Sequence, residues 1–277
     1  MLKKEFLASA IQMQCHVGSN ALALNLEKAE HYVNQASKLG VDLVVLPEAF
    51  NYGYNLDQAQ LLATVDSVLT RQALGDWAKK YNVSISAGVI EKDNNQIFNR
   101  TVFITPQGLS ATYEKIHLFK LGSADETQAF TPGQQRKSYQ AEFGPLGFLI
   151  CYDLRFPELA RALALDGVQT LLVSSAWGYG RRQHFRLLQQ ARAIENQIFL
   201  ISAGQVGENY RGGLKFSGHS VILDPLGTIL AEANDIEEKV LIAAINLNQI
   251  DVVRKNMNCL ADRVPHTYRN QGSNEAI

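Results

Sequence analysis

The sequence predicts an α/β fold, because strand-like and helix-like segments alternate along it in two successive series. Short, largely apolar runs such as residues 41–46 and 170–174 are typical of strands buried on both faces. Between them lie longer segments in which apolar residues recur every three or four positions, as in helices with one buried face. Buried strands of this kind need helices to cover them, which favours sheets with helical outer layers.

The first series begins with a predicted strand at residues 6–14, followed by a helix that Asn20 can cap and Gly40 ends. The apolar face of this helix is expected at Leu22, Leu26, Ala29, Val33 and Ala36. Further on, the pattern predicts strands at residues 41–46 and 83–89, a helix at 67–81, and a hairpin of strands 97–104 and 109–113 joined by turn residues 106–108.

The second series follows a long loop, residues 116–135, and a loop of that length inside a compact domain is usually functional. A helix is expected to begin at Pro157 and to end at Gly167, with apolar pairs at Leu159, Leu163, Ala160 and Ala164. The next predicted helix, residues 181–196, places Leu187, Ala191, Ile194 and Ile198 one above another as an apolar row. The remaining predicted strands are 148–151, 170–174, 198–203, 219–223, 228–231 and 240–245.

The balance of charge excludes several classes of protein. The chain has 26 lysines and arginines against 27 aspartates and glutamates, a formal net charge of -1, so no general attraction to nucleic acid or anionic membrane is expected. No apolar run approaches the ~20 residues that span a bilayer, and no signal peptide is expected. Three cysteines do not make a disulfide framework, so the expected compartment is the reducing cytoplasm.

No linker or low-complexity tract divides the sequence. We therefore expect a single domain over residues 1–277, a length that suits one large α/β domain. Residues from about 250 to 277 are interpreted as an extension that could lie at an oligomer interface.

Three reactive side chains follow the ends of predicted strands. Glu48 comes after the strand at 41–46, Lys115 after the hairpin strand at 109–113, and Cys151 after the apolar run that ends at Ile150. In α/β folds, ligands bind where the loops at such strand ends converge. Alone, each residue has a structural explanation, since a lone cysteine after an apolar run is usually a small core residue. Their combination predicts one catalytic site.

Around these residues the sequence resembles the nitrilase superfamily of carbon-nitrogen hydrolases. The matching segments are residues 46–50, 113–119, 149–158, 191–196 and 219–227. The resemblance implies a four-layer αββα sandwich without a metal or other cofactor. It implies a catalytic set carried here by Glu48, Lys115 and Cys151, with a second glutamate, Glu126, ahead of Pro132 and Gly133. It also implies a homodimer or a larger even-numbered assembly.

The chemistry of such a set follows from its residue types. A thiol with an ordinary pKa near ~8.5 is mostly protonated at neutral pH and needs a base, which Glu48 can supply. Lys115, as an ammonium, would stabilise the oxyanion together with a backbone N–H, for which we expect that of Tyr152. Glu126 would orient Lys115 or the substrate rather than carry protons.

Aromatic residues near these positions are the candidate walls of a substrate pocket. Phe119, Tyr152 and Trp177 lie in loops after strands, and Tyr54 follows Glu48 closely. Arg155 and Glu158 are expected to lock the turn that carries the nucleophile. The arginine pair at residues 181–182 either begins a helix that faces solvent or holds a substrate carboxylate.

Other constellations are weaker. A Cys-His pair could use His117, His184 or His219, but no protease signature surrounds Cys151. A metal site would need zinc-type spacing, which the remaining cysteines and histidines (Cys15, His16, Cys259 and His266) lack. No glycine-rich fingerprint for ATP or NAD is present.

The sequence therefore predicts an amidase that hydrolyses the terminal amide of a small carboxylate to acid and ammonia. Residues 51–54 and 181–185 resemble omega-amidase-type members, which act on α-keto amides such as α-ketoglutaramate. The resemblance also fits deaminated glutathione amidases, at residues 47–50 and 217–227. N-carbamoyl amino acid hydrolysis, nitrile hydrolysis and a catalytically silent scaffold remain alternatives.

Overall fold

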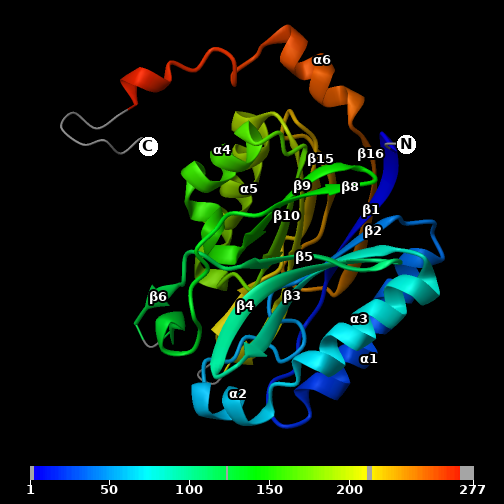
Figure 1. Cartoon of the computed structure of the whole chain (residues 1–277), viewed down its shortest axis with the longest axis vertical. Helices are drawn as coiled ribbons and strands as arrows, with labels where there is room; N and C mark the ends of the chain where they lie inside the picture. The colour runs from blue at the N-terminus through cyan, green and yellow to red at the C-terminus, as the bar shows by residue number, and fades with distance from the viewer. Residues whose placement is uncertain (1–2, 123, 211–213, 269–277) are drawn as a thin grey trace.

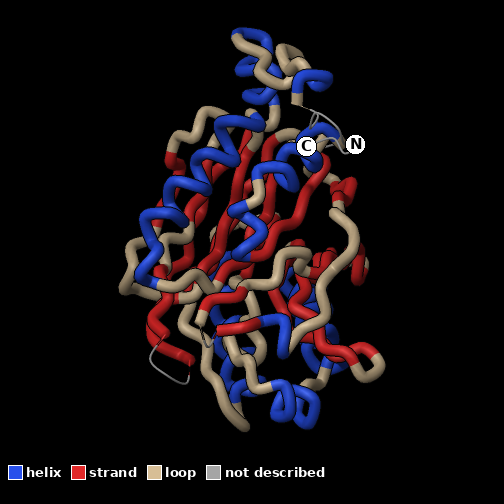
Figure 2. The backbone as a smooth tube through the Cα atoms, turned by 90° about the vertical axis from the view of Figure 1, so that its left-hand side faces the viewer, coloured by secondary structure: helices blue, strands red, loops and turns tan. Residues whose placement is uncertain are grey.

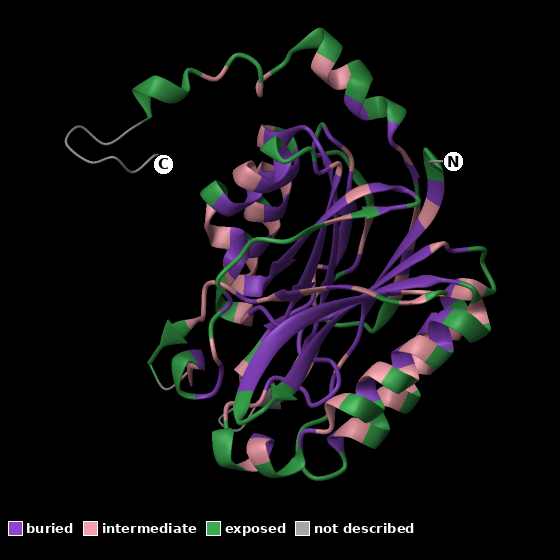
Figure 3. Cartoon of the chain, in the orientation of Figure 1, coloured by how far each residue is buried: buried purple, intermediate pink, exposed green. Residues whose placement is uncertain are grey.

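The computed structural model describes residues 3–122, 124–210 and 214–268. Its centre is formed by two six-stranded sheets packed face to face, and helices cover the outer face of each sheet (Figure 1). This is the four-layer αββα arrangement that was expected. The central strands of both sheets are almost entirely buried, whereas the edge strands are partly exposed and each helix exposes its outer side (Figure 3).

The first sheet has the strand order β16-β1-β2-β3-β4-β5. Three strands at its centre run parallel, and the strands that flank them are antiparallel. The six strands are β16 (Lys239–Asn246), β1 (Glu5–Gln12), β2 (Leu43–Leu46), β3 (Ser84–Asp93), β4 (Gln96–Thr105) and β5 (Gly108–Glu114).

The second sheet repeats this plan in the order β8-β9-β10-β11-β14-β15. Again one antiparallel strand precedes three parallel strands, and two antiparallel strands follow them. The strands are β8 (Ser138–Ala141), β9 (Gly144–Ile150), β10 (Thr170–Ser175), β11 (Phe199–Gly204), β14 (Val221–Leu223) and β15 (Ile229–Glu232).

Two helices cover each sheet. Helices α1 (Ala21–Ser37) and α3 (Ser67–Tyr81) pack on the first sheet. Helices α4 (Pro157–Leu165) and α5 (Arg182–Asn196) pack on the second and lie in front of its strands in Figure 2. Among the described residues, no helix is long and apolar enough to cross a membrane.

Most predicted elements are confirmed, with boundaries that differ by a few residues. The strand predicted at 148–151 begins at Gly144 and ends at Ile150, which leaves Cys151 outside it. In α1 the capping expectation is wrong, because the Asn20 side chain makes no cap hydrogen bond. Leu22 and Leu26 are only partly buried, while Asn25 is fully buried. Asn25 is accommodated because its side chain hydrogen-bonds the backbone of His16 and the carbonyl of Asn51.

The predicted apolar row of α5 is only partly correct, because Leu187 and Ile194 face outward, Ala191 is half-buried, and Ile198 lies beyond the helix and is fully buried in the core. Leu187 and Ile194 are 64% and 49% exposed. The buried positions of this helix include Gln189 and Arg192, because their side chains donate to the carbonyls of His219 and Leu154. The inner face of α5 therefore satisfies turn carbonyls that an apolar face would leave unpaired.

The sequence patterns missed the shorter elements. The unpredicted helices are α2 (Gln58–Thr64) and α6 (Asn248–Asn256), and the latter stands apart from the sandwich at the top of Figure 1. The unpredicted small strands are β6 (Lys120–Leu121), β7 (Ala124–Asp125), β12 (Val206–Tyr210) and β13 (Leu214–Ser217), and the edge strand β8 of the second sheet was not predicted either. The short 3₁₀ helices are η1 (Glu126–Gln128), η2 (Cys151–Arg155), η3 (Tyr179–Arg181) and η4 (Pro265–Thr267).

Candidate active site

Glu48 lies just beyond the carboxyl end of β2 and is fully buried between the two sheets. Its backbone is packed against β3 at Gly88, where an added Cβ would lie 2.6 Å from the Glu48 Cα. The amide side chain of Gln205, after β11, donates to the Glu48 carbonyl at 2.7 Å. A glycine on one sheet and a glutamine on the other therefore fix the turn that carries this carboxylate.

Three donors surround the carboxylate of Glu48. Lys115 Nζ and Asn99 Nδ2 both donate to Oε1, at 2.8 and 2.7 Å. The backbone N–H of Ala176, after β10, donates to Oε2 at 2.7 Å. Since these donors come from both sheets, the carboxylate is held in one orientation when the sheets are packed together.

Lys115 bridges two carboxylates. Its ammonium lies 2.8 Å from Glu48 and 2.8 Å from Glu126, and all three side chains are buried. Burial alone would lower the pKa of Lys115, but the Glu126 and Glu48 carboxylates outweigh burial and raise it. Lys115 is therefore a charged ammonium at neutral pH.

Glu126 begins the 3₁₀ helix η1 in the long loop after β5. Its Oε2 accepts the backbone N–H of Phe119 at 2.7 Å, and its own N–H donates to the Phe119 carbonyl. Burial raises the pKa of Glu126, and the attraction of Lys115 opposes that rise. Glu126 thus anchors the long loop to the buried ion cluster, the three charged groups Glu48, Lys115 and Glu126. This agrees with the expectation that the loop is functional.

Cys151 is the first residue after β9 and is 9% exposed. Its φ of 44° lies in the left-handed region, which costs energy for a residue other than glycine. Burial and the nearby Glu48 carboxylate raise the pKa of its thiol, while Lys115 lowers it less. The resting thiol is therefore protonated at neutral pH, so attack on a carbonyl requires a base.

Asp153 ties the turn of Cys151 to the segment that carries Lys115. Its buried carboxylate accepts the Tyr113 hydroxyl at 2.7 Å and the Ile150 N–H at 3.0 Å. It also accepts the backbone N–H of His117 at 3.0 Å, and the His117 ring Nδ1 lies 2.8 Å away. Because Tyr113 and His117 flank Lys115 in the chain, this one carboxylate sets the position of the thiol relative to the ammonium.

The structure also brings the candidate pocket residues to this place. Tyr54 is buried, and burial together with the Glu126 and Glu48 carboxylates raises the pKa of its hydroxyl. Tyr152 packs edge-on against Phe119, with ring centroids 5.2 Å apart. Trp177, directly after Ala176, is 4% exposed and donates its indole N–H to the Arg181 carbonyl.

The alternative nucleophile pairs and metal site gain no support. His117 is engaged by Asp153 and stacks on Phe156, His184 lies 3.4 Å from Arg155, and His219 lies 3.6 Å from Glu232. Among the described residues, no group of three or more histidine, cysteine or acidic side chains is arranged to hold a metal ion.

Sequence reasoning missed four residues that hold this site together, Asn99, Asp153, Ala176 and Gln205. Asp153 lies inside residues 149–158, one of the segments that resemble the family. The sequence therefore marked this segment but not the hydrogen bonds that Asp153 makes. Asn99 begins a short polar run in the middle of β4, and Gln205 directly follows the apolar strand β11, so polar residues in or beside buried strands were the available signal.

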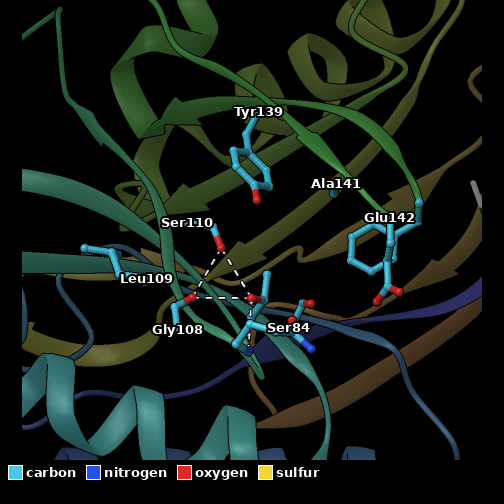
Figure 4. A pocket seen from close by; sticks show the side chains of 10 residues that line it. Ser84, Gly108, Leu109, Ser110, Tyr139, Ala141 and Glu142 are labelled. Carbon is cyan, nitrogen blue, oxygen red and sulfur yellow. Dashed lines mark hydrogen bonds between the residues drawn. The ribbon is translucent and has the colours of Figure 1, made fainter.

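A separate depression lies at the opposite end of the sandwich, near the start of β3 and the β8-β9 turn (Figure 4). It has a volume of about 670 Å³, and its lining includes Ser84, Thr105, Ser110, Tyr139 and Glu142. The Ser110 hydroxyl bonds Thr105 and the Gly108 carbonyl. None of the ion-cluster residues lines this depression, so it is distinct from the candidate active site.

The chain is similar to known proteins over most of its length. A family model described as carbon-nitrogen hydrolase matches residues 7–255. A deaminated glutathione amidase of Synechocystis sp. is 35% identical over 274 residues, covering 94% of this chain and 99% of that protein. A 2-oxoglutaramate amidase of Bacillus subtilis is 35% identical, over 84% of this chain and 88% of that protein.

A solved structure that is similar over nearly its whole length is that of a mutant of an amidase from Nesterenkonia sp. AN1, with the acetamide moiety of fluoroacetamide covalently added at its active-site cysteine. The two chains are 26% identical, superpose with a TM-score of 0.81, and each is covered over 95% of its length.

Proposed function

Since the chain belongs to the carbon-nitrogen hydrolase family, we propose that it cleaves the terminal amide of a small carboxylate, such as an α-keto-ω-amide, to the acid and ammonia. Membership makes the chain a hydrolase of carbon-nitrogen bonds. The observation that carries the proposal is the buried ion cluster in which Lys115 bridges Glu48 and Glu126 beside the Cys151 thiol.

In the first step, the Cys151 sulfur attacks the amide carbonyl carbon while its proton passes to Glu48. The hydrogen bonds of Glu48 indicate which oxygen receives the proton. Oε1 already accepts from both Lys115 and Asn99, whereas within the described residues Oε2 accepts one hydrogen bond, from Ala176. A carboxylate oxygen has about two lone-pair sites, so Oε2 keeps one open. Oε2 is therefore the basic atom of this mechanism.

The tetrahedral intermediate carries a negative oxygen that needs donors. Within the described part of the chain, two of the three Lys115 N–H groups are taken by Glu48 and Glu126, which leaves one for this oxygen. The backbone N–H of Tyr152, at the start of η2, is the second donor in our proposal. Each such donor typically contributes ~10²–10³ to the rate.

The intermediate then collapses and the carbon-nitrogen bond breaks. Glu48 returns its proton to the leaving nitrogen, which departs as ammonia and leaves a thioester on Cys151. Water attacks the thioester carbon as Glu48 accepts one of its protons, and the sulfur leaves and is reprotonated. The acid is released, and the thiol and the carboxylate return to their starting states.

The names of the relatives support an amide that also carries a carboxylate. The Bacillus subtilis relative is named for 2-oxoglutaramate and the Synechocystis relative for deaminated glutathione. Deaminated glutathione is thus the second candidate substrate, favoured by the coverage of nearly the whole of that relative. Hydrolysis of N-carbamoyl amino acids or nitriles is a less favoured outcome.

The proposal is tested by product release from a panel of compounds; the product is ammonia for all of them except deaminated glutathione, whose amide nitrogen leaves as that of cysteinylglycine. The panel contains α-ketoglutaramate, α-ketosuccinamate, deaminated glutathione, glutamine, N-carbamoyl amino acids and simple nitriles. We expect release from the keto amides, none with Cys151→Ala, and normal release with Cys15→Ala, because Cys15 is a buried thiol of the core. Release from nitriles alone would refute the amidase proposal, and activity in Cys151→Ala would refute the thioester.

We further propose that the chain forms a homodimer in the cytoplasm through the outer face of α5. Leu187 and Ile194 are large, exposed apolar residues on that face. Leu226, in the turn that packs against Ile194, is 61% exposed and extends the apolar surface. Contiguous exposed apolar surface of this kind commonly marks a protein interface.

A further inference from the structure

Ser175 is the last residue of β10, and it lies beside the proposed nucleophile. In the second sheet, Ser174 of β10 pairs with Ile150 of β9. The residues that follow this pair, Ser175 and Cys151, are therefore neighbours at the ends of two parallel strands. Ser175 is fully buried, so its hydroxyl is shielded from water at a place where it can reach the Cys151 sulfur.

The Ser175 hydroxyl is poorly engaged in the resting protein. Among the described residues, its oxygen has no hydrogen-bond partner at normal length and angle. Other buried serines, such as Ser202, are in the same situation, so a missing partner alone does not identify a functional group. Ser175 differs from Ser202 in its effect on the nucleophile. Burial and the Glu48 carboxylate raise the pKa of the Cys151 thiol, whereas Lys115 and the Ser175 hydroxyl lower it.

The ability of the sulfur to accept a hydrogen bond changes during the proposed reaction. A protonated thiol is a weak acceptor, whereas a sulfur that carries negative charge accepts strongly. The Cys151 thiol is protonated at rest, and it gains negative charge as its proton passes to Glu48 and again when the thioester bond breaks. A donor that is engaged in these transition states but not at rest accelerates both steps, because it stabilises them more than the ground state.

The carboxyl end of β10 is held in a fixed position next to both reacting groups. The Ser174 hydroxyl donates to the Leu46 carbonyl of β2 at 2.8 Å, which ties this end of the strand to the first sheet. Ala176, the residue after Ser175, donates its backbone N–H to Oε2 of Glu48 at 2.7 Å. Consecutive residues of one strand end thus reach the sulfur and the carboxylate oxygen between which the proposed proton transfer takes place.

We propose that the Ser175 hydroxyl donates a hydrogen bond to the Cys151 sulfur while that sulfur carries negative charge, both in thioester formation and in thioester hydrolysis. Ser175 keeps its own proton throughout. The thiol proton passes to Glu48, and when the carbon-sulfur bond breaks its electron pair returns to the sulfur, which Glu48 then reprotonates. This inference rests on the proposed amidase function and adds to it a group that sets the reactivity of the nucleophile.

The test removes the hydroxyl with Ser175→Ala and measures the nucleophile directly. Iodoacetamide alkylates the thiolate form of a cysteine, and peptide mass spectrometry distinguishes Cys151 from Cys15 and Cys259. We expect Cys151 to be alkylated about 10-fold to 100-fold more slowly at a fixed pH, because a hydrogen bond to a charged group is lost. The kcat for α-ketoglutaramate should fall by a similar factor with little change in KM. The melting temperature should not fall, because the resting hydroxyl has no well-formed hydrogen bond to lose.

Ser202→Ala is the matched control, because it makes the same change at another buried serine hydroxyl of the second sheet, on β11. It should leave both the alkylation rate of Cys151 and kcat unchanged. Equal losses in the two variants would mean that strand packing, rather than a hydrogen bond to sulfur, is responsible.

Unchanged alkylation of Cys151 in Ser175→Ala would overturn the inference even if turnover fell, because the loss would then be structural. Slower alkylation with an unchanged kcat would also overturn it, since the hydrogen bond would play no part in turnover. Either result leaves the amidase standing. If the unaltered protein released no product from any compound of the earlier panel, the proposed function itself would fail, and the alkylation rates would still show whether the hydroxyl reaches the sulfur.

Discussion

At the scale of single residues, the position of one carboxylate depends on an asparagine that carries no reactive group. The side chains of Asn99 and Lys115 both donate to Oε1 of Glu48. In addition, the backbone N–H of Lys115 donates to the backbone carbonyl of Asn99. Asn99 thus contacts both members of the proposed base and oxyanion pair. We regard it as a positioning residue, because it acts through Glu48 and Lys115.

Asn99→Ala should therefore lower kcat about 10-fold to 100-fold, because small misplacements of a catalytic group are costly, with little change in KM. Asn51→Ala is the control. Asn51 is also a buried asparagine, but its amide bonds Thr70 and the backbone of Ile90, away from the carboxylate. It should lower thermal stability by about 1–3 kcal/mol without changing kcat in the folded protein. Steady-state kinetics with thermal unfolding distinguishes the two, and a loss in KM alone for Asn99→Ala would contradict a positioning role.

At the scale of elements, the close approach of β3 to the turn after β2 is required for the site. At Gly88, an added Cβ would lie 2.6 Å from the Glu48 Cα and 2.8 Å from the Pro47 carbonyl oxygen. Both are backbone contacts, so a side chain there would displace the turn rather than rotate away.

We expect Gly88→Ala to destabilise the protein by about 1–3 kcal/mol or more and to reduce kcat/KM about 100-fold. Gly75→Ala makes the same chemical change on α3, where an added Cβ meets nothing within 4 Å. That variant should gain up to about 1 kcal/mol, because alanine favours helix over glycine. Denaturant unfolding and kinetics on both variants test this, and an active, stable Gly88→Ala would show that the turn tolerates displacement.

The same scale shows how far the sequence could predict this molecule. Regular spacing of apolar residues, together with proline or glycine at the ends of segments, located the long elements. One example is α4, which begins at Pro157 and buries all four of its predicted apolar residues. The inward face of α5 could not be predicted from the sequence. Gln189 and Arg192 are buried there because they hydrogen-bond backbone carbonyls that only the tertiary structure brings near. Short strands such as β12 and β13 form because they pair with each other, and no local sequence period marks them.

For the site, strand ends and the family resemblance indicated Glu48, Lys115 and Cys151, but not the groups that align them. The Ala176 donor is a backbone N–H, which leaves no trace in the residue type. Asp153 joins segments about 40 residues apart in the chain, and such pairing is a property of the packed fold.

At the scale of the whole molecule, the exposed apolar face of α5 decides the expected assembly. Leu187→Glu with Ile194→Glu should convert a dimer into a monomer of 30.7 kDa, because two buried charges would face their copies across the interface. Val68→Glu is the control, since Val68 is 73% exposed but lies on α3, on the opposite outer layer. Sedimentation or light scattering measures the mass. A protein that is monomeric before any substitution would refute the proposed interface.

The two sheets are built on one plan, yet they hold different chemistry. After the central parallel strand β2 stands Glu48, whereas the residue that follows its counterpart β10 is Ala176, which offers only a backbone N–H. Cys151 follows β9, and Met13, buried in the core, follows its counterpart β1. The two sheets are thus nearly symmetrical, but the residues that follow their corresponding strands differ. One half supplies the charged groups of the candidate site and the other supplies the sulfur, so under the proposed mechanism neither half could be replaced by a second copy of its partner without loss of activity.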